Sequence, residues 1–565
     1  MGENILIINL TRMGDLIQTS PAIAGIVRQR PGARVTMLAN AKFAATARFI
    51  PGVDELLTFD PHQFGSPDGV DEVDVLAMYD YLDGLAAGLA ARRFDRIINL
   101  SHSKASAMLA LLIGAPDIRG FGATQRGERM IRDPWLIYFT ALLAFRKLNR
   151  FNLVDLYLRG SGAVQDGSLR LALDPARAPS DGFTRTLAAH GVREGDMVIG
   201  IQAGASREDR RWDPRSFAAV ADRLARERGA KIVLFGAPSE KKLGDQVVGA
   251  MTAPAISLIG RTGLGELVHW AKRLDLLITN DTGTMHIAAA LGRSIVALFF
   301  VHARAEETGP YCENALVLQA DIECAPCTHQ TVCGHMTCLR LITPDDVVAA
   351  SLMALDGKKD LPAAPGLFAR TLVYRSAFNF HDRMIDFVPI RYVELRKEEL
   401  FAYLYRPLMI RALEAWDGPE RMPVESDFHG RVVEELTARF APPPRSALDM
   451  WTARALEGAS EMAAAAAECE RLAAALAAGN AAAQQTARAL DELDARIATL
   501  GATHEGLTPL AMLYRRRVEN LEGATQVELA RSAARAHGWL RRAALLLGGA
   551  LGKVNEGLRR AGFAK

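Results

Sequence analysis

A short apolar run near the N-terminus ends at a carboxylate that could act as a base. Residues 4–10, NILIINL, predict a buried strand, and Asp15 lies in the loop that joins this strand to the next helical segment. A side-chain carboxylate in such a loop can accept a proton from a hydroxyl group. Gly14 beside it allows a ligand to approach the backbone closely. Asp15 and Gln18 also fit a capping box, so the spacing alone favours a structural cap.

A second segment combines a glycine-containing turn with three arginines. Residues 197–204, MVIGIQAG, predict a strand, and Arg207, Arg210 and Arg211 follow within a few residues. Guanidinium groups bind phosphate oxygens through a planar fork of N–H donors, so this segment is suited to a diphosphate. The alternative is a solvated run of charge.

A third segment, residues 279–286 (TNDTGTMH), joins the end of a predicted strand to the start of a helix. Backbone N–H groups and the helix dipole favour a phosphate at such a junction. The alternative is an Asp or Thr helix cap followed by a buried histidine.

Four thiols lie close together in the sequence. Cys324, Cys327, Cys333 and Cys338 form a C-x2-C-x5-C-x4-C pattern, and the chain has six cysteines in all. So few cysteines form no disulfide framework and indicate a reducing compartment, where clustered thiols favour a metal site. A closed site of four thiolates would be structural, without an open position for chemistry. Free or redox-active thiols are the alternative.

The elements that position these segments alternate between apolar strands and amphipathic helices. This alternation predicts an N-terminal Rossmann-like domain over 1–172 and a second one over 173–355. Two open α/β domains in tandem place ligands in a cleft, at the carboxyl ends of the strands. The sequence contains neither the G-x-G-x-x-G dinucleotide fingerprint at the first turn nor a G-x-x-x-x-G-K-[ST] loop. The motifs that are typical of nicotinamide-dependent enzymes and of NTP hydrolases are therefore lacking.

The last third of the sequence has a different pattern. Residues 356–450 read as a mainly helical extension, to which we assign no activity. Residues 451–505 are Ala-rich and carry a heptad-like seam from Met462 to Leu500, which predicts a coiled coil or a two-helix hairpin that breaks at Gly479-Asn480. The seam could serve self-association or, alternatively, pack on its own chain. Residues 506–565 are basic and amphipathic, which favours peripheral contact with an anionic membrane or packing on another subunit.

Composition excludes several classes of function. The chain has 565 residues, with 67 Lys and Arg against 65 Asp and Glu, so a net charge of +2 gives no field to attract nucleic acid. The N-terminus is not typical of a signal peptide, and no apolar run approaches the ~20 residues of a spanning helix. We therefore expect a cytoplasmic protein, with peripheral contact at the inner face of the cytoplasmic membrane as a further expectation.

Together, at this order and spacing, the motifs resemble the ADP-heptose:lipopolysaccharide heptosyltransferases (glycosyltransferase family 9), which are inverting enzymes of the GT-B fold. The resemblance covers residues 1 to about 355 and is carried by ILIINLTRMGDLIQTSPAI, IGIQAGASREDRRWDPRSFAAVADRL, LFGAPSEKK and ITNDTGTMHIAAALGRSIVALF. It implies that Asp15 is the general base and that Arg210, where the family often has Lys, contacts the diphosphate. The other donor-binding residues that it implies are Gly14, Glu240, Asp281, Thr282, Gly283 and His286.

The resemblance also implies the reaction and the ligands. The expected donor is an ADP-sugar. The expected acceptor is a hydroxyl of lipopolysaccharide core or of an adhesin. The adhesin is included because the Cys cluster resembles that of autotransporter heptosyltransferases that hold iron. No catalytic metal is expected, while Cys324, Cys327, Cys333 and Cys338 would hold structural iron or zinc. The alternatives are a GT-B sugar-nucleotide epimerase and a non-catalytic GT-B scaffold that serves assembly.

Overall fold

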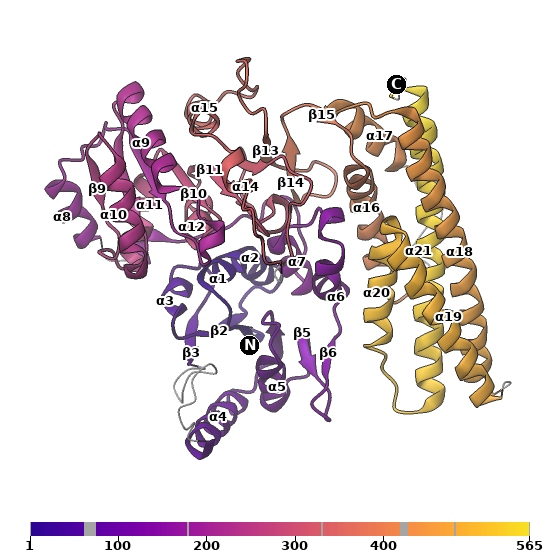
Figure 1. Ribbon diagram of the computed structural model, residues 1–565. Coiled ribbons are helices and arrows are strands. Elements are labelled where there is room, and N and C mark those ends of the chain that lie inside the picture. Colours follow the sequence, from indigo (N-terminus) through magenta and orange to yellow (C-terminus); the bar gives the residue numbers. More distant parts are fainter. Residues whose placement is uncertain are drawn as a thin grey trace. The chain divides into compact units, whose positions relative to one another are not determined.

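The computed structural model describes residues 2–60, 75–177, 180–328, 331–418, 428–479 and 482–563. The chain forms two compact units (Figure 1). Unit 1 comprises Met1–Met130 and Phe151–Arg391, and unit 2 comprises Ile131–Arg150 and Tyr392–Lys565. The helical extension expected at 356–450 is therefore divided between them.

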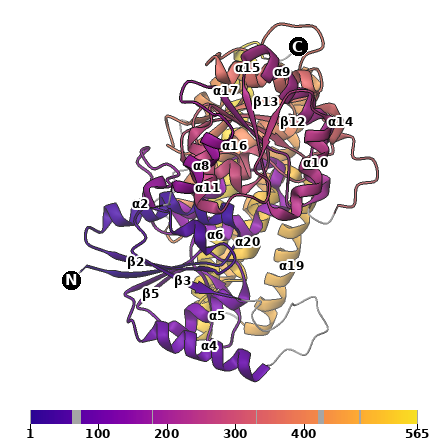
Figure 2. The same ribbon diagram turned by 90° about the vertical axis from the view of Figure 1, so that its left-hand side faces the viewer.

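The first half of unit 1 is a sheet in the order β3-β2-β1-β4-β5-β6, and its strands from β3 to β5 are parallel. Strand β1 is central, and Ile5, Leu6, Ile7 and Ile8 are at most 1% exposed, because helices cover both faces. Figure 2 shows α2 on one face and α4 and α5 on the other. The elements are β1 (Asn4–Asn9), β2 (Arg34–Asn40), β3 (Glu55–Phe59), β4 (Arg96–Asn99), β5 (Asp117–Ala123), β6 (Arg129–Ile131), α1 (Met13–Gln18), α2 (Ser20–Gln29), α3 (Ala44–Ala47), α4 (Val75–Ala90), α5 (Lys104–Ile113) and α7 (Leu153–Gly160).

The second half of unit 1 is a sheet in the order β14-β13-β12-β11-β10-β7-β8-β9. Its strands are parallel from β12 to β9, and helices lie between them in sequence. The elements are β7 (Val198–Gln202), β8 (Lys231–Phe235), β9 (Ala255–Ser257), β10 (Leu276–Asn280), β11 (Ser294–Phe299), β12 (Leu316–Ala320), α8 (Asp181–Ala189), α9 (Pro214–Arg228), α10 (Lys241–Ala250), α11 (Leu264–Arg273), α12 (Gly283–Ala290), α13 (Ala305–Thr308), α14 (Cys338–Leu341) and α15 (Pro344–Leu355).

Two antiparallel strands extend this second sheet beyond residue 355. Strands β13 (Thr371–Phe378) and β14 (Ile385–Pro389) pair with β12 and with each other. The prediction of a mainly helical 356–450 is therefore wrong over this stretch. Residues of β13 are rich in aromatic and β-branched types, which pack well on a half-buried sheet.

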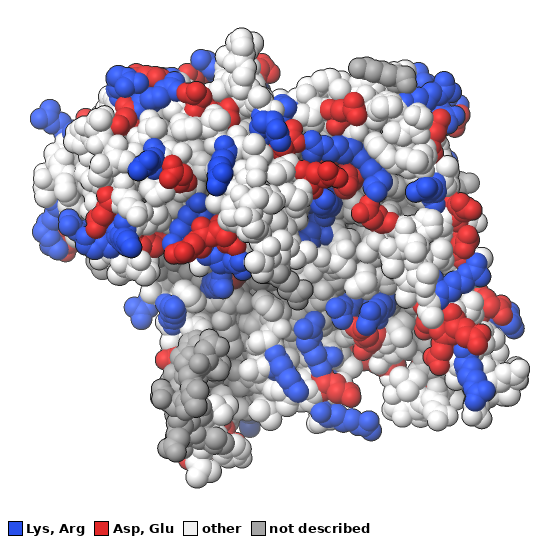
Figure 3. Space-filling model, viewed as in Figure 1, with Lys and Arg blue, Asp and Glu red and all other residues white. Residues whose placement is uncertain are grey.

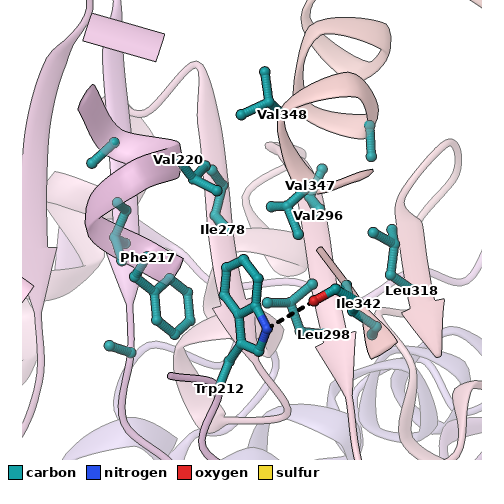
Figure 4. Close-up of a cluster of buried hydrophobic side chains, with 14 of the residues drawn as sticks. Trp212, Phe217, Val220, Ile278, Val296, Leu298, Leu318, Ile342, Val347 and Val348 are labelled. Atoms are coloured by element: carbon teal, nitrogen blue, oxygen red, sulfur yellow. Dashed lines mark hydrogen bonds between the residues drawn. The ribbon is translucent and has the colours of Figure 1, made fainter. Parts of the chain in front are cut away.

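A buried tryptophan fixes the arginine-bearing loop to the core of the second half. Trp212 is 1% exposed, and its Nε1 donates to the carbonyl of Ile342 at 3.3 Å (Figure 4). Its ring meets Phe217 edge to face, with centroids 5.0 Å apart. Because Trp212 directly follows Arg211, this anchor holds the end of the charged segment in place.

Unit 2 is helical, apart from one short strand pair. Its long helices lie side by side in Figure 1, and α18 packs along α21 and against α19. The elements are α6 (Pro134–Ala141), α16 (Lys397–Glu414), α17 (Phe428–Arg439), α18 (Arg445–Ala477), α19 (Ala483–Thr503), α20 (Thr508–Val518), α21 (Gln526–Arg560), and the parallel pair β15 (Val393–Glu394) and β16 (Phe440–Ala441).

The seam predicted from Met462 to Leu500 is interrupted. Helix α18 ends at Ala477 and α19 begins at Ala483, while Asn480 of the predicted break lies outside the described residues. Met462 and Cys469 are fully buried within the unit. The break agrees with the predicted two-helix hairpin, and a single continuous helix over 451–505 is wrong. Self-association through the seam stays a prediction.

The basic tail is also packed within its own unit. Trp539, Leu547 and Leu551 of α21 are fully buried, so the apolar face expected to meet a membrane is already occupied. Arg541 forms an ion pair with Glu470 at 2.7 Å. Peripheral membrane contact of the tail stays a prediction.

Charges of both signs are mixed on the surface. Figure 3 shows Lys and Arg beside Asp and Glu over the face in view. Among the helices that the structure describes, none is both long enough and apolar enough to cross a bilayer.

Candidate active site

Asp15 is the third residue of α1 and a carboxylate at the edge of the first sheet. The capping box joins it to Arg12, so the predicted box of Asp15 with Gln18 is wrong. Asp15 lies in the first turn of α1, directly after β1, and its Oδ2 accepts the backbone N–H of Arg12 at 3.2 Å. The side chain stays partly exposed. Burial nevertheless raises its pKa, although hydrogen bonds to Arg12 and Thr11 and the nearby His102 oppose the shift. A carboxylate with a raised pKa is a better proton acceptor than an ordinary surface Asp.

Asp281 meets Arg210 at the carboxyl end of the second sheet. Nη1 of Arg210 lies 2.9 Å from Oδ2 of Asp281, with side-chain exposures of 11% and 14%. Burial raises the pKa of Asp281 to about 6, which Arg210 opposes and which the negative charges of Asp15 and Glu307 reinforce. Asp15 adds to the raised pKa of Asp281, and Gly14 beside it packs against Gly283 and His286, so the two sheets present carboxylates to one region.

The three arginines of the loop have different surroundings. Arg207 is exposed and forms an ion pair with Asp209 at 2.5 Å. The alternative of a solvated charged residue therefore applies to Arg207. Arg211 donates to the carbonyl of Ala205 at 3.2 Å. Arg210 additionally donates to the hydroxyl of Ser206. Of the three, Arg210 is the one that the fold directs toward the segment at 279–286.

The start of α12 has backbone donors directed at this region. Thr282 is the N-cap residue with extended backbone, and its Oγ1 lies 3.1 Å from that of Thr279 instead of capping the helix. The first N–H groups of a helix have no partner within the helix. An anionic ligand can therefore bind at the start of α12.

His286, Gly14 and Gly283 allow α1 to pack closely against α12. His286 is 4% exposed, and Nε2 of Gln18 lies 2.8 Å from its Nε2. Burial lowers the pKa of His286 to about 4, so the ring is neutral near pH 7. A Cβ on Gly14 would lie 2.9 Å from Cδ2 of His286, and one on Gly283 would lie 2.2 Å from Cε of Met13. Their roles as donor contacts stay predictions.

Glu240 is held at the carboxyl end of β7. Its Oε2 accepts the backbone N–H of Ala237 at 2.8 Å and Nε2 of Gln202 at 3.2 Å. A Cβ on Gly204 would lie 1.8 Å from its Oε1, so only glycine admits the carboxylate here. Gln202 also accepts the hydroxyl of Thr284 at 3.2 Å, which connects Glu240 to α12.

Sequence reasoning missed several residues of this region. Gln202 ends a predicted strand, and that position was a usable signal for it. Tyr157 gave no signal, because only the fold brings it near Asp15. Gln18 and Ser206 belong to the quoted motifs, but nothing local indicated that they would contact His286 and Arg210.

The four thiols at 324–338 lie near one another but do not form a closed set. Burial raises the pKa of Cys327, and the other three thiols add to the shift. Over the described ranges, the one set of three or more Cys, His, Asp or Glu side chains whose ligand atoms all lie within 4.8 Å of each other is elsewhere, in unit 2. The donors suit iron or zinc, but a tetrahedral site would require them to move closer.

Part of the chain is similar to a known family. Residues 84–336 match glycosyltransferase family 9 (heptosyltransferase). Lipooligosaccharide heptosyltransferase 2 of Campylobacter jejuni subsp. jejuni serotype O:2 is 31% identical over 164 residues, which is 28% of this chain and 50% of that protein. Lipopolysaccharide heptosyltransferase 2 of Escherichia coli K12 is 26% identical over 311 residues, covering 52% of this chain and 82% of the relative. The chain thus spans about half the length of the first relative.

A solved structure shares the fold. The glycosyl transferase family 9 protein from Veillonella parvula DSM 2008 matches with a TM-score of 0.52 and 24% identity, over 63% of this chain and 98% of that one. This likeness agrees with two α/β halves followed by an additional region.

Proposed function

We propose that this chain, which carries a glycosyltransferase family 9 domain, is an inverting glycosyltransferase that transfers heptose or a related sugar from an ADP-activated donor to a hydroxyl acceptor. The observation that carries the proposal is the packing of Gly14, next to Asp15, against Gly283 and His286 of α12, the helix that begins just after the Arg210–Asp281 pair. Ligands of open α/β proteins bind at the carboxyl ends of the strands.

Asp15 acts as the general base. Its carboxylate accepts the proton of the acceptor hydroxyl, and that oxygen attacks the anomeric carbon while the bond to the diphosphate breaks. One inversion needs one base, unlike the pair of carboxyl groups in a retaining hydrolase. The raised pKa of Asp15 supports this role.

Arg210 and the start of α12 stabilise the departing ADP. Guanidinium and backbone N–H groups oppose the negative charge that develops on the diphosphate, and their positions are fixed before reaction. Arg210 is paired with Asp281, so a bound diphosphate competes with that carboxylate for the same donors. Glu240, which Gln202 and Gly204 position, contacts the nucleoside.

The acceptor is a hydroxyl of lipopolysaccharide core or of an adhesin side chain. The names of the relatives favour the lipopolysaccharide acceptor. The thiols at 324–338 hold a structural iron or zinc ion in this proposal, and elemental analysis tests it.

A thermal-shift panel of ADP, UDP, GDP and NAD tests the donor class. Selective stabilisation by ADP is expected, because a ligand that binds only the native state raises its stability. Stabilisation by UDP alone would contradict the proposal and favour the epimerase. Product analysis with ADP-heptose and no acceptor then separates transfer from epimerisation, and no nucleotide response at all would favour the scaffold.

A further inference from the structure

Four helices of unit 2 each bring one polar side chain to the same place in the bundle. Cys469 comes from α18, Asp494 from α19, Tyr514 from α20 and His537 from α21. The ligand atoms of Cys469, Asp494 and His537 all lie within 4.8 Å of one another. Tyr514 joins them, because its hydroxyl donates to Asp494 and lies 2.8 Å from Nδ1 of His537.

This cluster lies in the interior of the bundle. Cys469 is fully buried, His537 is 3% exposed and Asp494 is partly exposed. Polar groups in such a place need compensating partners. Within the part of the chain that the structure describes, no Lys or Arg forms an ion pair with Asp494, so no side-chain cation offsets its charge.

The residue types in the cluster are those that bind transition metals. Cys469 offers a sulfur, His537 an imidazole nitrogen and Asp494 a carboxylate oxygen, and the three come from different helices. A divalent cation here would favour both the thiolate and the carboxylate.

We propose that Cys469, Asp494 and His537 bind one zinc-class transition-metal ion that links α18, α19 and α21. Thiolate, imidazole and carboxylate together suit Zn²⁺ or Co²⁺, whereas Mg²⁺ and Ca²⁺ require oxygen ligands. The phenol of Tyr514 or a water molecule completes the tetrahedron. This site is separate from the thiols at 324–338 and does not depend on the proposed function.

The test uses Co²⁺ as a spectroscopic probe in the full-length, chelator-treated protein. The background carries Cys324→Ser, Cys327→Ser, Cys333→Ser and Cys338→Ser, so that the loop thiols bind no ion. We expect one Co²⁺ per chain, with the visible bands of tetrahedral cobalt and a near-ultraviolet charge-transfer band from thiolate to metal.

Single substitutions then identify the ligands. Cys469→Ala should remove the charge-transfer band, and His537→Gln should remove the tetrahedral bands. Cys312→Ala is the matched control, because Cys312 is a free thiol of unit 1 and lies outside the cluster. It should leave both signals unchanged.

A further variant covers the case in which those proteins misfold. Tyr514→Phe keeps all three proposed ligands but removes the hydrogen bonds of the phenol, so it should still bind Co²⁺, and Zn²⁺ should still raise its unfolding temperature. Absence of tetrahedral bands in the folded parent protein, or bands unchanged by Cys469→Ala, would overturn the proposal and leave a purely hydrogen-bonded cluster.

Discussion

Nη1 of Arg210 lies 2.9 Å from Oδ2 of Asp281, so the arginine proposed to bind diphosphate is already paired with an acid. The two residues are 71 positions apart and come from the loops after β7 and β10. Binding of a diphosphate must therefore replace or share this contact. The carboxylate holds the guanidinium in place, ready for the proposed donor.

Replacing Arg210 with Ala should weaken ADP binding by about 10- to 100-fold, because a charged hydrogen-bonded contact of roughly 1.5–3 kcal/mol is lost. Calorimetric titration with ADP measures the change. Arg207→Ala is the control, since Arg207 is exposed and paired with Asp209. Equal losses in the two variants would mean that the arginines act only through general charge.

Asp281 should make folding stability depend on pH. Its folded pKa of about 6 lies above the ordinary 3.8, so its contribution is fully present at low pH and is lost as the pH rises through 6. Relative to Asp281→Asn, the wild type should lose about 3 kcal/mol of unfolding free energy between about pH 4 and about pH 7, since each unit of pKa is ~1.4 kcal/mol. Urea unfolding of both proteins measures this, and a constant difference would contradict the burial of Asp281.

Gly204→Ala should act through Glu240. The new methyl group would occupy the place of Oε1, so the carboxylate must turn away from Gln202. Donor affinity should fall about as much as in Glu240→Ala, and the double variant should be no worse than either, which is the coupling expected of residues in contact. Fully additive losses would show that Gly204 acts independently of Glu240.

A chain that ends near residue 450 should fail to fold properly. Such a cut removes most of α18 and all of α19 to α21, which exposes the residues of α16 and α17 that pack on α21. We expect aggregation and lost helicity, measured by light scattering and circular dichroism. A soluble, cooperatively unfolding product would show that the remaining helices form a stable unit alone.

The alternating strands and helices of residues 1–355 and the positions of Asp15 and Asp281 could be predicted from the sequence. Local apolar runs determine strands, and motifs at strand ends follow from them. The strands β13 and β14 could not be predicted, because the second sheet offers them an edge that the local pattern does not reveal.

Long-range pairings were also beyond the sequence. Gln18 and His286 are 268 positions apart, and only the packing of α1 on α12 brings them together. Cys469 and His537 were visible as seam and tail residues, yet nothing local indicated that their helices pair. The same packing buries the tail, which its amphipathic pattern alone assigned to a membrane or another subunit.

The rate of sugar transfer by Asp15→Asn tests the central claim most directly. Asparagine keeps the size of the side chain and its acceptor oxygen for Arg12 but cannot take up the proton. Asp222→Asn is the control, because Asp222 caps the backbone of Thr252 and Ala253 away from the site. With ADP-heptose and acceptor, Asp15→Asn should turn over at least ~10²-fold more slowly at unchanged ADP affinity, and wild-type turnover should fall as the pH drops through the raised pKa of Asp15. Transfer by Asp15→Asn at the wild-type rate would contradict the account, because Asp15 would then be only a cap.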